Sequence, residues 1–150
     1  MARSRGSRPG RAVSGGLLAA AATVVGVLGA GHLVLLYASP TLSPDDDLAK
    51  RLAVSVVPLS DATNVLRLWV GFNVSHSLGA LVFALTFGYL ALAHDELLFD
   101  SPYLLVIGAA YLLTMLLTSV RYWFNVPSIG LALSTVLYLA GAVLGATGLA

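Results

Sequence analysis

Long apolar runs separated by short polar segments dominate the pattern of hydrophobic and polar positions along the chain. An α-helix rises ~1.5 Å per residue, so about 20 apolar residues cross a hydrocarbon layer ~30 Å thick. Each of the runs is long enough to do so. The pattern therefore predicts four transmembrane helices, which cover about residues 14–37, 65–93, 102–120 and 127–149.

The polar segments between the runs predict the connections. Residues 38–64 hold prolines, acidic residues and basic residues that are incompatible with lipid exposure, so they form the longest loop. Within it, the acidic run Asp45–Asp47 can cap a short helix that continues through Val57. The link over residues 94–101 is short, which predicts that the second and third helices are antiparallel.

The beginning of the chain is basic and sets the expected orientation. Residues 1–12 contain four arginines among glycine, serine and proline, and we expect them to form a disordered basic tail before a single domain over residues 13–150. Arginine favours the cytoplasmic side, and four spans return the chain to it, so both termini are expected in the cytoplasm. The first run is longer than the ~7–15 residues of a signal-peptide core, so an uncleaved anchor fits better than a cleaved signal.

Composition agrees with a cell-membrane protein. Of the 150 residues, 58% are apolar and 10% are charged, with a mean hydropathy of +0.90, and a soluble domain of this size cannot bury so much apolar surface. The net charge of +1 offers no field for nucleic acid, so membrane lipids are the expected partners. The absence of cysteine excludes disulfides and thiolate metal sites. We therefore predict an all-α, membrane-embedded antiparallel four-helix bundle.

Small residues recur at helical spacing in two of the predicted spans. Inside a membrane, helices associate through close backbone approach, which small residues permit. We therefore expect two contact faces, which could also join copies in a homo-oligomer. One consists of Gly71, Ser75 and Gly79, and the other of Gly141, Gly145 and Gly148.

A few polar side chains inside the spans are costly to bury in lipid and therefore informative. At ~1.5 Å per residue, His32 lies about 8 Å below the outer boundary, Asn73 about 12 Å and His76 about 16 Å. Trp69 and Arg121 belong to the same end of the spans. These five residues predict a polar pocket that opens toward the outer leaflet, and we take them as ligand-binding residues.

Three interpretations of this pocket stay open. The polar groups could only hydrogen-bond between helices, which is the simplest reading. They could instead bind a lipophilic molecule with a polar head, such as a quinone or a lipid headgroup held by Arg121. His32 and His76 could also ligate haem or a metal ion, although no cofactor is predicted from the sequence. No catalytic residue is assigned, because Ser75 and His76 point about 100° apart on a helix.

Three short strings carry a resemblance to a known family. They read GHL at 31–33, WVGFNVSHSLG at 69–79 and RYWF at 121–124. With them the chain resembles an uncharacterised family of small bacterial four-helix integral membrane proteins over most of residues 15–148. The resemblance implies the four-span topology and no activity. Similarity to DoxX-like proteins is limited to size and span number, so no role is carried over from them.

The sequence thus favours a non-catalytic membrane protein of unknown activity with a small polar pocket in the outer half of the bundle, which could bind a lipophilic ligand. The alternative is a membrane redox or lipid-modifying enzyme that uses haem or quinone near His32 and His76.

Overall fold

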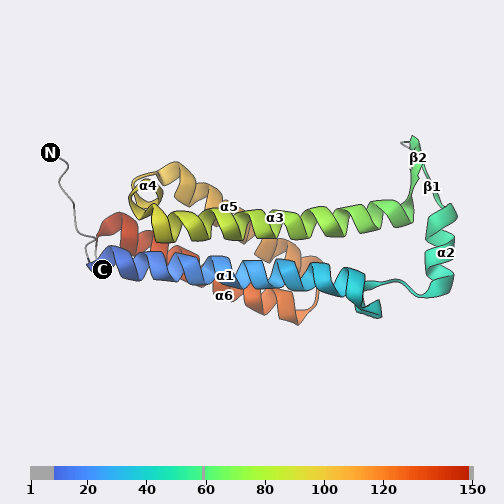
Figure 1. Cartoon of the computed structure of the whole chain (residues 1–150), viewed down its shortest axis with the longest axis horizontal. Helices are drawn as coiled ribbons and strands as arrows, with labels where there is room; N and C mark the ends of the chain where they lie inside the picture. The colour runs from blue at the N-terminus through green and yellow to red at the C-terminus, as the bar shows by residue number, and fades with distance from the viewer. Residues whose placement is uncertain (1–8, 59, 149–150) are drawn as a thin grey trace. The chain divides into compact units, whose positions relative to one another are not determined.

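The structure is a computed structural model that describes residues 9–58 and 60–148, and helices dominate it (Figure 1). The predicted all-α class is confirmed. The chain order is α1 (Pro9–Ala38), the 3-10 helix η1 (Pro40–Leu42), α2 (Asp46–Val54), β1 (Val56–Val57), β2 (Ser60–Asn64), α3 (Val65–Ala93), α4 (Asp95–Phe99), α5 (Pro102–Tyr122) and α6 (Asn125–Thr147).

Four helices in the described ranges are long and apolar enough to cross a membrane. They are α1 from Gly10 onward, α3, α5 and α6, with 21 to 29 residues each and hydropathies of 1.6 to 2.0. The bounds of α3 coincide with the predicted run over 65–93. The helix α5 ends two residues later than predicted, and α6 both begins and ends two residues earlier than predicted. Proline at the first position of α5 fits its start, because its fixed φ suits the first turn of a helix.

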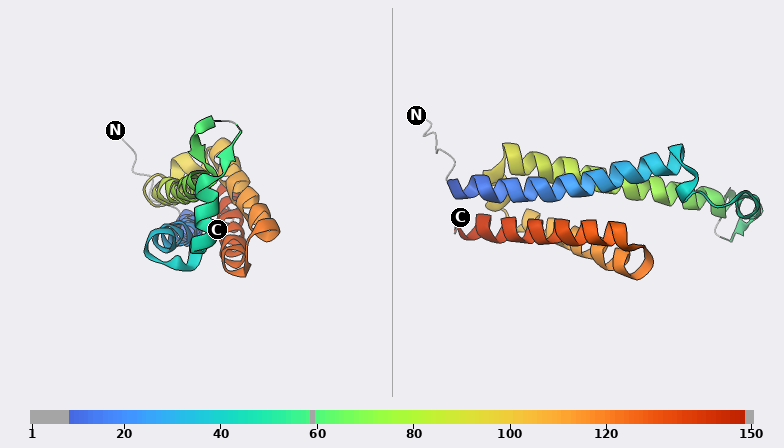
Figure 2. Two further views of the ribbon diagram at one scale, coloured as in Figure 1. Left: turned by 90° about the vertical axis from the view of Figure 1, so that its right-hand side faces the viewer. Right: turned by 90° about the horizontal axis from the view of Figure 1, so that it is seen from below.

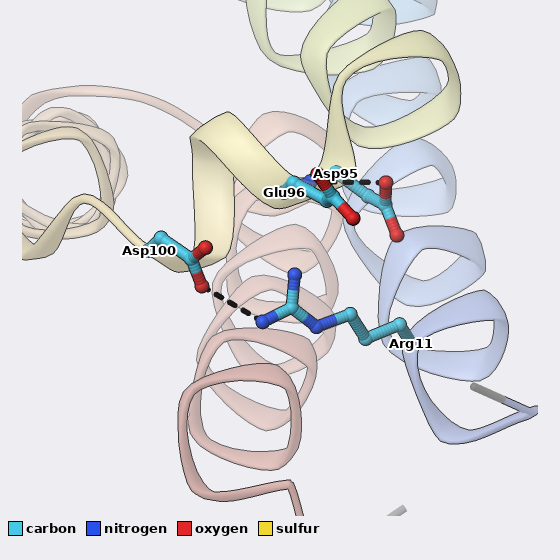
Figure 3. A network of polar contacts seen from close by, with 4 residues as sticks. All are labelled: Arg11, Asp95, Glu96 and Asp100. Atoms are coloured by element: carbon cyan, nitrogen blue, oxygen red, sulfur yellow. Dashed lines mark hydrogen bonds and ion pairs between the residues drawn. The ribbon is translucent and has the colours of Figure 1, made fainter. Parts of the chain in front are cut away.

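The helix α1 begins earlier than we predicted, because residues 9–12 are helical rather than part of a disordered tail. Arg11 has a partner there: its guanidinium donates to the Asp100 carboxylate at 2.7 Å, beside Asp95 and Glu96 of α4 (Figure 3). This contact compensates a charge that we had expected to stay outside the helix. Residues 1–8 of the predicted tail lie outside the described residues.

The loop between α1 and α3 contains more structure than its composition indicated. The predicted short helix is α2, where the Asp45 side chain accepts a hydrogen bond from the Leu48 backbone N–H at 2.9 Å. It ends at Val54 rather than Val57, because the chain then turns into a small antiparallel hairpin of β1 and β2. We did not predict this hairpin, whose strands are too short to show an alternating pattern.

The chain divides into two compact units, and each is described by itself. One unit contains residues up to Gly26 together with residues from Val82 onward, and the other contains Val27–Leu81. Within each unit, α1 and α3 lie side by side (Figure 1). In the first unit, α5 and α6 also pack against each other (Figure 2).

Small residues bring the helices of the first unit together. A Cβ on Gly15 would lie 2.7 Å from the Ala91 carbonyl oxygen, and a Cβ on Gly141 would lie 2.8 Å from the Ser14 carbonyl oxygen. Gly145 packs in the same way against the ring of Phe99. The predicted contact face at Gly141 and Gly145 is therefore confirmed within the chain. Gly148, with φ of 66°, instead ends α6 in the left-handed conformation.

An aromatic core fills the space between α3, α5 and α6 in this unit. The Phe83 ring lies 4.6 Å from that of Tyr111 and 4.7 Å from that of Phe87, measured between centroids. Tyr138 is completely buried beside them, and its hydroxyl donates to the Leu105 carbonyl oxygen at 3.2 Å. The polar end of this side chain is thus satisfied inside an apolar core.

Candidate functional site

The second unit contains the polar side chains that the sequence singled out. They lie where the C-terminal part of α1 meets the N-terminal part of α3. Close approach begins at Gly29, where an added Cβ would lie 2.8 Å from the Cβ of Ala80 and 3.1 Å from the Ser77 carbonyl oxygen. One turn further along α1, His32 faces Asn73 of α3.

Hydrogen bonds join this cluster across the two helices. His32 Nε2 lies 2.8 Å from Asn73 Oδ1, and because an amide oxygen only accepts, the imidazole is the donor. The other half of the amide is fixed too, since Asn73 Nδ2 donates to the Trp69 carbonyl oxygen at 2.7 Å. Ser77 is completely buried and donates to the Asn73 carbonyl oxygen at 3.0 Å. The cluster therefore links α1 to one face of α3.

His76 completes the cluster through ring contacts. Its ring centroid lies 5.7 Å from that of His32 with an interplanar angle of 72°, and it is stacked on Phe72 at 6.1 Å with an angle of 14°. The two imidazoles thus touch edge to face, which leaves no gap for a porphyrin between them. Because His32 Nε2 is also engaged by Asn73, a two-histidine haem does not fit this arrangement.

A metal site finds little support in the same geometry. Two imidazoles supply two ligands, whereas protein metal sites generally use three or more. Within residues 9–58 and 60–148, no group of three or more His, Cys, Asp or Glu residues is placed to hold an ion.

Four of the five predicted site residues come together. Asn73 and His76 each contact His32 through side chains, and Trp69 contributes its carbonyl oxygen. Arg121 belongs to the other unit, where its guanidinium lies 5.7 Å from the centre of the Tyr122 ring. Its approach to the cluster stays a prediction.

Within this unit, α3 does not pack against α1 through the predicted contact face of Gly71, Ser75 and Gly79. A Cβ added to Gly71 or Gly79 would meet no atom within 4 Å. The physical reason is rotation about the helix: Gly71 lies about 160° from Asn73, and α1 already occupies the Asn73 side. Contact between copies of the chain through this stripe stays a prediction.

Part of that stripe instead lines an open groove that the sequence analysis missed. The groove has a volume of about 520 Å³ and is mainly apolar. Its lining consists of Tyr37, Leu66, Arg67, Val70, Gly71, Val74, Ser75 and Leu78. The recurrence of Arg67, Gly71, Ser75 and Leu78 every three or four residues was a signal for it, because these positions share a helix face.

No protein-family model, curated protein or solved structure matches the chain.

Proposed function

We propose that the chain is a non-catalytic integral membrane protein that binds a lipophilic molecule with a polar head in the outer half of an antiparallel four-helix bundle. The proposal places both termini in the cytoplasm, as the arginines at the start of the chain favour. It takes its ligand-binding residues from the cluster of His32, Trp69, Asn73 and His76, with Arg121 at the same membrane boundary.

The observation that carries the membrane assignment is the apolar outer surface of all four long helices. Large apolar side chains on each of them are mostly exposed, among them Val27 at 66%, Leu85 at 73%, Leu117 at 71% and Val136 at 65%. A soluble monomer rarely exposes such continuous apolar surface, because contact with water is unfavourable. Lipid tails are the solvent that suits these faces.

The polar cluster supports ligand binding because it places a few polar groups among apolar helix surfaces. It gathers two imidazoles, a side-chain amide and the Trp69 backbone carbonyl group within helices that are otherwise mainly apolar. A lipophilic molecule with a polar head needs such a combination of apolar walls and a few oriented polar groups. A quinone belongs to this class of molecule, so a purified sample also tests the alternative of a membrane redox enzyme. The edge-to-face contact between His32 and His76 disfavours haem as its cofactor.

A reporter fusion tests the topology. An enzyme that is active only in the cytoplasm, joined after Ala150, should be active, and the same enzyme inserted between Asp46 and Asp47 should be inactive. The reason is that four spans return the chain to the side on which it began. Activity of the loop insertion and inactivity of the C-terminal fusion would reverse the orientation, and activity of both would overturn the span number.

Purification tests the ligand. We expect detergent-purified protein to retain a stoichiometric lipophilic molecule in native mass spectrometry, without a haem band in its absorption spectrum. His76→Gln should lower ligand retention at least fivefold and leave the thermal melting profile unchanged, while His94→Gln, outside the cluster, should retain the ligand. An empty wild-type protein would reduce the cluster to a packing contact, and a haem band would favour the redox enzyme.

A further inference from the structure

We infer that the groove on α3 binds one anionic phospholipid of the outer leaflet, with the headgroup phosphate at Arg67 and an acyl chain over Gly71 and Ser75. The inference rests on the membrane insertion proposed above, but it concerns a site separate from the His32 cluster. No residue of the cluster lines the groove, and Gly71 and Ser75, over which the acyl chain would lie, each point about 160° from Asn73 around α3.

The charge at the mouth of the groove selects the headgroup. Arg67 is the third residue of α3 and is exposed. Neither of the ion pairs within the described residues includes it, and its hydrogen bond to the Ala62 carbonyl oxygen is long, at 3.4 Å. A guanidinium offers five N–H donors in a planar fork that suits a phosphate. An anionic headgroup therefore complements this end.

The length and lining of the groove select an acyl chain. From Arg67 to Leu78 the helix rises about 16 Å, close to the ~15 Å of hydrocarbon in one leaflet. Below the arginine the lining is nearly all apolar, and the Ser75 hydroxyl is satisfied by the Phe72 carbonyl oxygen at 3.0 Å. The missing side chain of Gly71 makes the hollow, since nothing lies within 4 Å of its Cβ position. A phospholipid matches both the charged mouth and the apolar floor.

Two substitutions separate the headgroup from the acyl chain. Arg67→Gln should remove the preference for the anionic lipid, and Gly71→Leu should fill the hollow and weaken all phospholipids. The matched controls are Arg51→Gln, which removes an exposed arginine on α2, and Gly79→Leu, which adds the same side chain to α3 at an exposed position outside the groove. Thermal melting of each variant establishes that it is folded.

The experiment is a native mass spectrometry titration of the full-length chain with palmitoyl-oleoyl phosphatidylglycerol and palmitoyl-oleoyl phosphatidylcholine. We expect one phosphatidylglycerol to bind about fivefold more tightly than phosphatidylcholine, as ~1 kcal/mol for one basic residue implies. Arg67→Gln should make the two lipids equal, Gly71→Leu should weaken both at least fivefold, and the controls should match the wild type.

Several outcomes would overturn the inference. Equal binding of the two lipids to the wild type would remove the role of Arg67, and equal weakening by Gly71→Leu and Gly79→Leu would indicate unspecific lipid around the helices. A dimer that Gly71→Leu dissociates would assign the groove to a second copy. Flotation with carbonate-washed vesicles keeps the two proposals distinguishable: loss of flotation refutes membrane insertion, whereas failure of the groove alone leaves flotation intact.

Discussion

Replacing Gly141 with alanine should destabilise the folded chain by about 1–3 kcal/mol, the usual cost of forcing an extra methyl group into a packed interior. The added Cβ would lie 2.8 Å from the Ser14 carbonyl oxygen and would also collide with Leu18. A backbone atom cannot rotate away, so α1 and α6 would have to separate. Steric conflict therefore outweighs the ~1 kcal/mol by which alanine favours a helix over glycine. Unfolding in mixed micelles titrated with denaturing detergent measures the change.

The matched control is Gly16→Ala on α1. A Cβ on Gly16 would meet nothing within 4 Å, so only the helix preference acts, and the variant should be as stable as the wild type or up to ~1 kcal/mol more stable. The diagnostic result is that Gly141→Ala lowers the free energy of unfolding, whereas Gly16→Ala leaves it unchanged or raises it. Equal effects would mean that α1 and α6 do not approach each other as closely as Gly141 and Ser14 do here.

Replacing Asn73 with leucine should cost about 1–2 kcal/mol, because the His32 imidazole loses its acceptor inside an apolar environment. His32→Leu should cost a similar amount, since the Asn73 side-chain oxygen then lacks its donor. The double variant should be less destabilised than the sum of the two single variants, because removing both partners leaves neither polar group unsatisfied. We expect a coupling energy of about 1 kcal/mol, near the upper range for hydrogen bonds between membrane helices.

The same unfolding titration, applied to all four proteins of this cycle, measures the coupling. Ser75→Ala serves as a control on the same helix, since its hydroxyl donates only to the Phe72 carbonyl oxygen of α3 itself. Strict additivity of Asn73→Leu and His32→Leu would show that the 2.8 Å bond contributes no net stability.

The long helices could be predicted because charge and proline mark their ends. Val65–Ala93 was predicted with the bounds that the structure has, because polar residues flank this apolar run and its only Asp, Glu, Lys or Arg residue is Arg67, near its start. The start of α1 could not be predicted, because the partner of Arg11 is Asp100, 89 residues further along the chain. The hairpin of β1 and β2 was missed for a different reason: two and five residues give too short a pattern to detect.

The members of the polar cluster could be predicted from the sequence, but the face of α3 that packs against α1 could not. Helical periodicity puts Asn73 and His76 on one face, and the cost of burying polar groups pointed to His32 as their partner. Periodicity alone could not show which face of α3 receives α1, so Gly71 and Gly79 were assigned to a contact that Asn73 and Ser77 make instead. All these residues lie on α3, so only the position of α1 decides which face of α3 packs against another helix and which face lines the groove.

The hydrogen bond from the buried Ser134 hydroxyl to the Ala21 carbonyl oxygen joins α6 to α1 across 113 residues of sequence. A ribosome adds about 5–20 residues per second, so α1, which ends at Ala38, is complete about 5–20 seconds before Ser134 of α6 is added. During that interval one face of α1 lacks the helix that buries it in the folded chain. This face contains Ser14, Leu18 and Ala21. The interior of the first unit is therefore closed only once α6 has been made, and a chain interrupted before α6 would leave that face of α1 open to the insertion machinery or to lipid.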